Sequence, residues 1–224
     1  MSEPIPQELA RVYSNRFDAT QAYRREVWGV LISDFFQALL PPGATLLDLG
    51  CGYGEFVNQV EAAKKYGMDL NPNTASHLDR NVQLLAQDCS KQWELPDSTL
   101  DVVFTSNFFE HLPDKIALGR TLDEAFRCLK PGGQLIALGP NIKYTGGSYW
   151  DFWDHYLPLT EASLSEALKT RGFEITRCEP RFLPYTMAKR PQYPMWMLGL
   201  YLRLPLLWRV KGRQFLVVAR KRAA

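Results

Sequence analysis

The 224-residue sequence predicts an α/β protein built on a doubly wound, mostly parallel sheet. Along most of the chain a short apolar run, a turn and a longer amphipathic stretch follow one another, and this alternation is typical of parallel strands covered by helices. The length suits one domain, and 46% hydrophobic with 22% charged residues is close to the globular average. We therefore expect a single folded core.

Short apolar runs predict seven strands: Thr45–Leu49, Lys65–Asp69, Val82–Ala86, Val102–Ser106, Gln134–Leu138, Phe173–Arg177 and Gln214–Ala219. Helices are expected between most of them. The clearest, Lys115–Leu129, carries an apolar stripe that includes Ile116 and Leu122. An earlier helix, Tyr23–Leu40, ends at a Pro-Pro-Gly turn. The last two strands are expected to pair as an antiparallel hairpin at the sheet edge.

Charge and cysteine content disfavour several classes of function. The formal net charge of +2 gives no basis for a nucleic-acid partner, and none is expected. The four cysteines form no C-x-x-C pair, which argues against a zinc ribbon or a disulfide framework and fits a reducing cytoplasm. The first residues do not resemble a secretory signal, no apolar run has membrane-spanning length, and no carboxylate cluster indicates a metal.

A glycine-rich turn follows the first predicted strand. Gly50, Gly52 and Gly54 alternate shortly after Asp48, a spacing that lets the backbone turn sharply against a ligand. A dinucleotide is disfavoured because Glu55 stands where G-x-G-x-x-G needs its third glycine. The nearby carboxylates favour a nucleoside that carries a positive charge at this place, as S-adenosylmethionine does at its methionine end. The alternative is a tight turn that binds nothing.

Acidic residues follow the next two predicted strands. Asp69 lies about twenty residues after the glycine turn, where a carboxylate can accept both ribose hydroxyls of a nucleoside. Its alternative role is to cap a helix that begins near Asn71. Asp88 is a candidate partner for the adenine amino group, with the backbone N–H of Cys89 donating to the ring.

The segments 48–54 and 129–133, together with Asp69 and Asp88, resemble the class I S-adenosylmethionine-dependent methyltransferases in order and spacing. The resemblance covers about residues 41–138 and is closest in style to the type 11, small-molecule branch. It implies a seven-stranded sheet with a reversed last strand, S-adenosylmethionine as cofactor and S-adenosylhomocysteine as product. It also implies that the following residues flank the cofactor: Asp48, Gly50, Cys51, Gly52, Gly54, Leu70 and Asn107.

Two histidines are candidates for a general base, which is needed if a hydroxyl accepts the methyl group. His111 follows the fourth predicted strand, at the sheet edge where ligands bind. The alternative is that its loop only shapes the cofactor pocket. His155 is preferred; it lies in an aromatic, glycine-hinged stretch, residues 141–160, which is expected to form a lid over the acceptor. Plain packing on the sheet edge is the alternative for this stretch.

Residues 1–40 are expected to form an N-terminal helical cap on a core of residues 41–224. In the family that the chain resembles, such a cap often closes over the methionine part of the cofactor. Tyr13 and Arg16 are candidates for its carboxylate, Arg16 through a bidentate pair, with a solvated helix end as the alternative. The adjacent pair Arg24 and Arg25 is interpreted as a solvated helix face.

A second insertion, residues 184–212, is apolar almost all round from Tyr193 to Trp208. It suits a peripheral contact with the inner membrane face through residues 193–213, with Trp196, Tyr201 and Trp208 at headgroup level. A homodimer interface and a buried lid are the alternatives.

The leading functional hypothesis is O-methylation of a saccharide or a lipid-linked glycan. A second hypothesis is C- or O-methylation of a quinone-like or other small ring acceptor. A third, from a different class, is a non-catalytic module that only binds S-adenosylmethionine.

Overall fold

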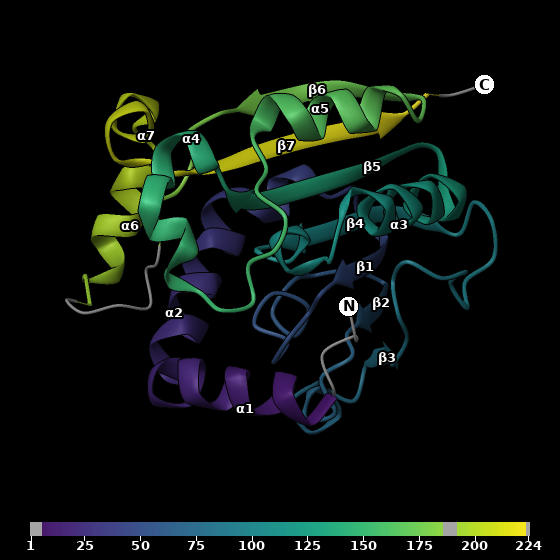
Figure 1. The fold of residues 1–224 in the computed structure, drawn as a ribbon, viewed down its shortest axis with the longest axis horizontal. Coiled ribbons are helices and arrows are strands. Elements are labelled where there is room, and N and C mark those ends of the chain that lie inside the picture. The colour runs from purple at the N-terminus through teal and green to yellow at the C-terminus, as the bar shows by residue number, and fades with distance from the viewer. Residues whose placement is uncertain (1–5, 186–191, 223–224) are drawn as a thin grey trace.

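The computed structural model describes residues 6–185 and 192–222. Residues 1–5 of the expected cap and 186–191 of the apolar insertion lie outside the described residues. A seven-stranded sheet with the order β3-β2-β1-β4-β5-β7-β6 runs through the molecule, with helices packed against it (Figure 1).

The strands are β1 (Thr45–Leu49), β2 (Lys64–Met68), β3 (Val82–Leu85), β4 (Leu100–Ser106), β5 (Leu129–Pro140), β6 (Phe173–Glu179) and β7 (Gln214–Lys221). Strands β3, β2, β1, β4 and β5 pair in parallel. The last strand, β7, is reversed, because it runs antiparallel to both β5 and β6. The predicted α/β fold is confirmed, and each of the seven predicted strands forms close to its expected place.

The helices are α1 (Pro6–Phe17), α2 (Gln21–Leu31), α3 (Lys115–Cys128), α4 (Ile142–Thr145), α5 (Glu161–Lys169), α6 (Met195–Leu202) and α7 (Pro205–Lys211). Short helical turns are η1 (Asp18–Thr20), η2 (Ile32–Phe36), η3 (Gln37–Leu39), η4 (Thr74–Ser76), η5 (Phe109–His111) and η6 (Gly146–Asp151). The expected helix of residues 23–40 is therefore regular only to the end of α2. It continues as the π-helical turn η2 and the tighter turn η3.

Two hydrophobic clusters cover the two faces of the sheet. Neighbouring residues of a strand point to opposite faces, so Leu47 packs with α3 and α5, whereas Leu46 packs with α2 and α7. Val27 and Leu31 of α2 are buried in the second cluster. The second helix of the expected cap is thus part of the core and holds the α1–α2 region against the sheet.

The expectation of helices between most strands is wrong for the first three crossovers. After β1 the chain makes a series of turns, in which the Asn58 N–H donates to the Gly54 carbonyl and the Val60 N–H to the Phe56 carbonyl, and after β2 it makes only η4. Residues 86–99, all described, form no helix before β4. The stripe predicted for α3 also fails at Ile116, which is 65% exposed. Ile116 lies two residues from Leu118, so the two side chains leave opposite sides of the helix.

The apolar insertion folds into α6 and α7. Trp208, expected at lipid headgroup level, is instead 4% exposed, because its ring packs against Phe35 and Phe182 and its indole N–H donates to the Tyr201 carbonyl at 2.9 Å. Trp196 is 69% exposed, as expected. Among the described residues, no helix is long and apolar enough to cross a membrane.

Candidate active site

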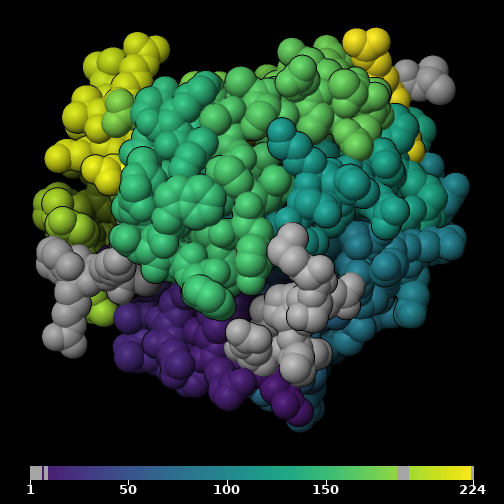
Figure 2. Space-filling view, in the orientation of Figure 1, coloured from purple at the N-terminus to yellow at the C-terminus, as the bar shows by residue number. Residues whose placement is uncertain are grey.

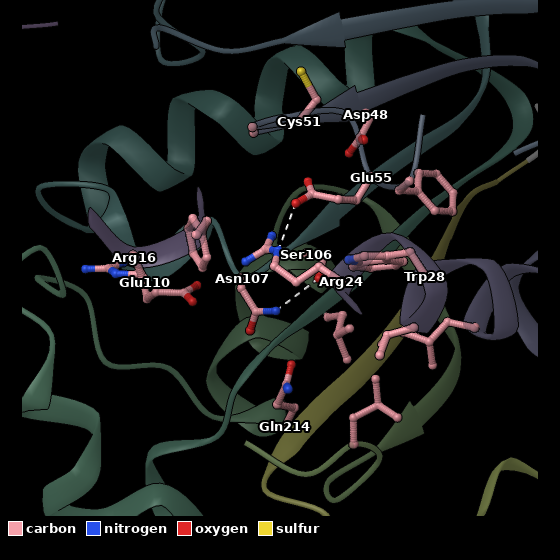
Figure 3. Close-up of a pocket in the computed structure, with 18 of the residues that line it drawn as sticks. Arg16, Arg24, Trp28, Asp48, Cys51, Glu55, Ser106, Asn107, Glu110 and Gln214 are labelled. Carbon is pink, nitrogen blue, oxygen red and sulfur yellow. Dashed lines mark hydrogen bonds and ion pairs between the residues drawn. The ribbon is translucent and has the colours of Figure 1, made fainter. Parts of the chain in front are cut away.

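A cavity of about 310 Å³ opens at the carboxyl ends of β1 and β4, where open α/β sheets bind ligands (Figure 3). Its polar and aromatic wall comes from four regions of the chain: Tyr13, Arg16, Arg24 and Trp28; Asp48, Gly50, Cys51, Gly52 and Glu55; Ser106, Asn107, Glu110 and His111; and Phe152, His155, Tyr185 and Gln214. The topology thus brings the expected cap, the glycine turn, the end of β4 and the expected lid to one place.

The glycine turn after β1 has a backbone that other residues adopt only with strain. Gly50, Gly52 and Gly54 have φ values of 74°, 52° and 77°. A Cβ on Gly50 would lie 2.3 Å from the Phe108 ring, and a Cβ on Gly52 would lie 2.9 Å from the Tyr13 ring. These rings bound the place where a ligand meets the turn, and there is no room there for a side chain.

A carboxylate and a guanidinium beside the glycine turn suit the ammonium and carboxylate groups of a bound amino acid. Asp48 is 4% exposed, and burial, with repulsion from Glu55 and Asp69, raises the pKa of its carboxyl well above the usual range. A cation beside Asp48 would offset this cost. Arg24 lies opposite: its Nε donates to Glu55 at 2.8 Å, and its terminal nitrogens donate to none of the described residues (Figure 3). A buried carboxylate, and a guanidinium whose terminal nitrogens have no hydrogen-bond acceptor among the described residues, fit the ammonium and carboxylate of methionine.

The acids expected for ribose and adenine lie beside the cavity rather than in its wall. Asp69 accepts the backbone N–H groups of Gly52 and Asn71, each at 2.8 Å, and each carboxylate oxygen keeps a lone pair for a hydroxyl. No helix begins at Asn71 in this described stretch, so Asp69 is not a helix cap. Asp88 accepts the backbone N–H and the hydroxyl of Ser90, both at 2.8 Å. Both acids keep their expected places after β2 and β3.

Cys51, Cys89 and Leu70 were expected to contact the cofactor, and the structure leaves mainly their backbone atoms for such a contact. The sulfur of Cys51 points away from the cavity (Figure 3). The buried thiol of Cys89 accepts the Thr121 hydroxyl at 3.4 Å. Leu70 is 45% exposed next to Asp69. Asn107 does line the cavity, with a positive φ of 50° and its side chain donating to the Ser106 hydroxyl at 3.1 Å.

Arg16 forms its bidentate pair inside the protein. Its two terminal nitrogens donate to the Asp154 carboxylate at 2.6 and 3.2 Å, although Arg16 also lines the cavity, where it was expected to meet a ligand carboxylate. The pair ties α1 to the stretch of residues 141–160, and Figure 2 shows the green surface of that stretch bordering the purple N-terminal helices. Tyr13 lies over Gly52, and burial raises the pKa of its hydroxyl well above the usual range.

Three ionisable side chains meet at one end of the cavity. Glu110 and His111 of η5 and His155 of the expected lid place their ligand-type atoms within 4.8 Å of one another. The His111 Nδ1 lies 2.8 Å from the Asp154 carbonyl and 3.2 Å from its carboxylate. Burial lowers the pKa of His111, but the bond to Asp154 and the charge of Glu110 outweigh it and raise the pKa overall.

Burial sets the protonation of the other two members of this cluster. It raises the pKa of Glu110 to about 7. Burial and the neighbouring His111 lower the pKa of His155 to about 4, so its ring is neutral at pH 7. The Nδ1 atom of His155 is buried and has no hydrogen-bond partner among the described residues.

The expected lid is fastened to η5. The backbone N–H groups of Tyr156 and Leu157 donate to the Glu110 carbonyl at 2.8 and 3.1 Å. Tyr149 is fully buried, whereas Trp150 and Trp153 are 58% and 82% exposed. The aromatic residues of this stretch therefore divide between packing at the cluster and contact with solvent.

Sequence reasoning missed Arg24 and Gln214 as members of the site. The signal for Arg24 was present, because it shares a helix face with Val27, Trp28 and Leu31, the side that packs toward the sheet. Gln214 gave none: its amide nitrogen donates to the Pro184 carbonyl at 2.7 Å, and its oxygen is buried without a partner among the described residues.

Comparison with known proteins gives the class. A family model described as a methyltransferase domain matches residues 20–177, more than half of the chain. A crystal structure of an S-adenosylmethionine-dependent methyltransferase from Archaeoglobus fulgidus matches with a TM-score of 0.68 at 21% identity, over 92% of this chain and 99% of the other. The protein belongs to this methyltransferase family, and its fold is that of the class I S-adenosylmethionine-dependent enzymes.

Relatives in sequence differ in their named substrates. The 2-methyl-6-phytyl-1,4-hydroquinone methyltransferase of Synechocystis sp. is 31% identical over 125 residues, 51% of this chain and 38% of that protein. The malonyl-[acyl-carrier protein] O-methyltransferase of Methylococcus capsulatus is 27% identical over 183 residues, 75% of this chain and 65% of that protein. The chain spans between 21% and 53% of the length of the curated relatives it matches first.

Proposed function

We propose that this protein transfers the methyl group of S-adenosylmethionine to an oxygen atom of a small, ring-containing acceptor. One observation carries the proposal: a single cavity joins groups that fit an amino acid, at the glycine turn, to the Glu110–His111–His155 cluster. When bound, S-adenosylmethionine supplies an electrophilic methyl group. The chain's part is to align the acceptor with it and to receive the acceptor's proton.

The cluster supports oxygen as the methylated atom. A hydroxyl must lose its proton when it is methylated, so a group that accepts the proton has to lie beside it. The unpartnered Nδ1 of His155 and the carboxylate of Glu110 are such groups. Asp154 holds the His111 ring through Nδ1, the kind of orienting contact found where a base is positioned.

The remaining wall of the cavity supports a ring on the acceptor. It is aliphatic and aromatic, with Trp28, Leu31, Phe104, Leu138 and Leu183. A ring with few polar groups can be buried there without leaving hydroxyls unpaired. The relative from Synechocystis is named for a hydroquinone and neither relative for a saccharide. A saccharide remains the second candidate for the acceptor.

The test combines calorimetric titration of S-adenosylmethionine with transfer of a labelled methyl group to three matched acceptors. These are a hydroquinone, the corresponding aniline and a methyl glycoside. We expect binding of the cofactor and labelled ether from the hydroquinone. Faster transfer to nitrogen would contradict the proposal, and labelled glycoside would favour the saccharide. Cofactor binding with no transfer to any acceptor would indicate a non-catalytic module.

We further infer that a lipid-linked acceptor would be met at the surface of α6 and α7. Trp196 and Leu206 are 69% and 74% exposed, and the neighbouring Arg209 is exposed as well, a combination that suits an anionic lipid surface. This surface adjoins the cavity, because the hydroxyl of Tyr23 in the cavity wall accepts the Tyr193 backbone N–H at 3.1 Å.

Flotation with phosphatidylglycerol vesicles checks the membrane contact. We expect the protein to float with the vesicles and the variant Leu206→Ser/Val210→Ser to stay behind, because both side chains are more than half exposed and would enter the lipid interface. Ile116→Ser on α3 is the control, since Ile116 is 65% exposed on another helix. Loss of a dimer in sedimentation, without any flotation of the intact protein, would assign the surface to the homodimer instead.

A further inference from the structure

Side chains from two distant segments form a compact set of ligand atoms at the acceptor end of the cavity. One carboxylate, Glu110, and two imidazoles, His111 and His155, lie with these atoms within 4.8 Å of one another. The sequence shows no carboxylate cluster, which is why no metal was expected. The structure instead builds a set with one carboxylate and two imidazoles, whose members meet only through the contacts of the expected lid with η5.

We propose that Glu110, His111 and His155 hold a divalent transition-metal ion beside the bound acceptor. The first support is burial. Glu110 is 4% and His155 is 7% exposed, and the His155 Nδ1 has no hydrogen-bond partner among the described residues. A buried ring nitrogen without a partner costs free energy, and coordination to a cation would satisfy it.

The second support is the way the two rings are held. The His111 Nδ1 bonds to Asp154 at 2.8 Å, so Nε2 is the ring atom left for a ligand. The His155 ring stacks on Phe152 with the ring centroids 4.8 Å apart, and its Nδ1 has no hydrogen-bond partner among the described residues. Histidines that bind metals usually donate their other ring nitrogen to a carboxylate or a carbonyl, which fixes the ring and the tautomer. His111 has such a partner in Asp154.

The charges around the cluster leave room for a cation. The positive charge of Arg16 acts on Glu110, and this charge is matched by the bidentate pair with Asp154. The carboxylate of Glu110 is therefore not matched by a side chain of fixed positive charge.

The donor set selects the kind of ion. Two imidazole nitrogens with one carboxylate suit Zn²⁺ or Fe²⁺, whereas Mg²⁺, Ca²⁺ and Mn²⁺ prefer oxygen ligands. Three protein ligands leave at least one coordination position open toward the cavity. An acceptor hydroxyl bound there would have a lowered pKa and would give up its proton to water, because with the ion bound the coordinated His155 and Glu110 no longer accept it. This last role rests on the proposed function, whereas the metal site itself rests on the cluster.

Cobalt is a suitable probe because its visible spectrum reports ligand type and geometry. Chelator-treated protein is titrated with Co²⁺, followed by absorption, and Zn²⁺ is then added in competition. We expect one Co²⁺ per chain, with bands that indicate nitrogen ligands and that Zn²⁺ displaces. In His155→Ala and Glu110→Gln the affinity should fall more than tenfold, because even residues that only support a ligand contribute about 10- to 100-fold.

The third histidine of the chain provides the matched control. His77 follows η4, stacks on Tyr53 at 3.9 Å and does not line the cavity, so His77→Ala should bind Co²⁺ as the parent protein does. Glu110→Gln preserves side-chain size if His155→Ala does not fold. Unchanged Co²⁺ affinity in the cluster variants, an equal loss in His77→Ala, or no binding by the parent protein would overturn the metal site.

Titration of S-adenosylmethionine on the same samples separates this proposal from the function. If the parent protein binds no Co²⁺ or Zn²⁺ and still binds S-adenosylmethionine and transfers its methyl group, the metal site is overturned and the proposed function stands. A metal bound through the cluster, without any methyl transfer, would leave the site standing and overturn the function.

Discussion

Replacing either imidazole of the cluster by alanine is expected to lower the rate of methyl transfer by about 10²- to 10⁴-fold, the usual contribution of positioned proton transfer. His111 and His155 both line the cavity, and their rings lie 5.0 Å apart. The affinity for S-adenosylmethionine should stay within a few-fold, because the glycine turn, Asp48 and Arg24 are untouched. Single-turnover transfer to the hydroquinone and calorimetry of the cofactor measure the two quantities.

A loss of methyl-transfer rate without a loss of cofactor affinity distinguishes a catalytic role of the histidines from a role in holding the fold. A variant that only loosened the expected lid would lose cofactor affinity and thermal stability together with rate, because Arg16 ties that stretch to α1. His77→Ala is the control for loss of an imidazole outside the cavity. A modest fall in rate for both His111→Ala and His155→Ala would show that positioning alone drives the reaction, and it would remove the assigned role of the cluster.

The strands were predictable because a strand that is buried on both faces of the sheet consists of consecutive apolar residues. In β1, Leu46, Leu47 and Leu49 are all fully buried, and a central parallel strand therefore reads as a continuous apolar run. The acids after β2 and β3 follow from the same reading, since a chain that leaves the sheet edge must expose polar groups there.

The early crossovers were not predictable in the same way. Phe56, Val57 and Val60 are buried after the glycine turn, and their spacing indicates a helix. The chain buries them with a few hydrogen-bonded turns, none of which continues into a helix, before β2 begins at Lys64. Apolar periodicity reports which side chains are buried, and a short turn can satisfy it as well as a helix.

The assembly of the site depends on contacts without a local pattern. Arg16 and Asp154 are 138 residues apart in the sequence, yet they form a bidentate ion pair. The sequence analysis named Arg16 because the segment before the core often closes over the methionine part of the cofactor in the family that the chain resembles, and it interpreted Arg24 and Arg25 together as a solvated helix face. Only the packing of α2 against the glycine turn shows that Arg24 points inward and Arg25 outward.

Replacing Arg24 by methionine is therefore expected to weaken binding of S-adenosylmethionine about 10- to 150-fold. A hydrogen bond to a charged group contributes roughly 1.5–3 kcal/mol, and about 1.4 kcal/mol corresponds to a factor of ten. The guanidinium of Arg24 lies over the Phe17 ring, 3.7 Å from its centroid, so the change removes this contact together with the hydrogen-bonding nitrogens, while methionine keeps most of the apolar length of the side chain. Arg25→Met is the matched control, because Arg25 is the exposed neighbour on the same helix.

A second ligand tells which part of the cofactor Arg24 meets. 5′-Methylthioadenosine lacks the amino-acid portion, so its affinity should be nearly the same for the parent protein and Arg24→Met. The loss of affinity would then belong to the methionine carboxylate, as the free guanidinium nitrogens in the cavity indicate. An equal loss for both ligands would mean that Arg24 acts through Glu55 and the shape of the glycine turn, and the carboxylate would need another partner.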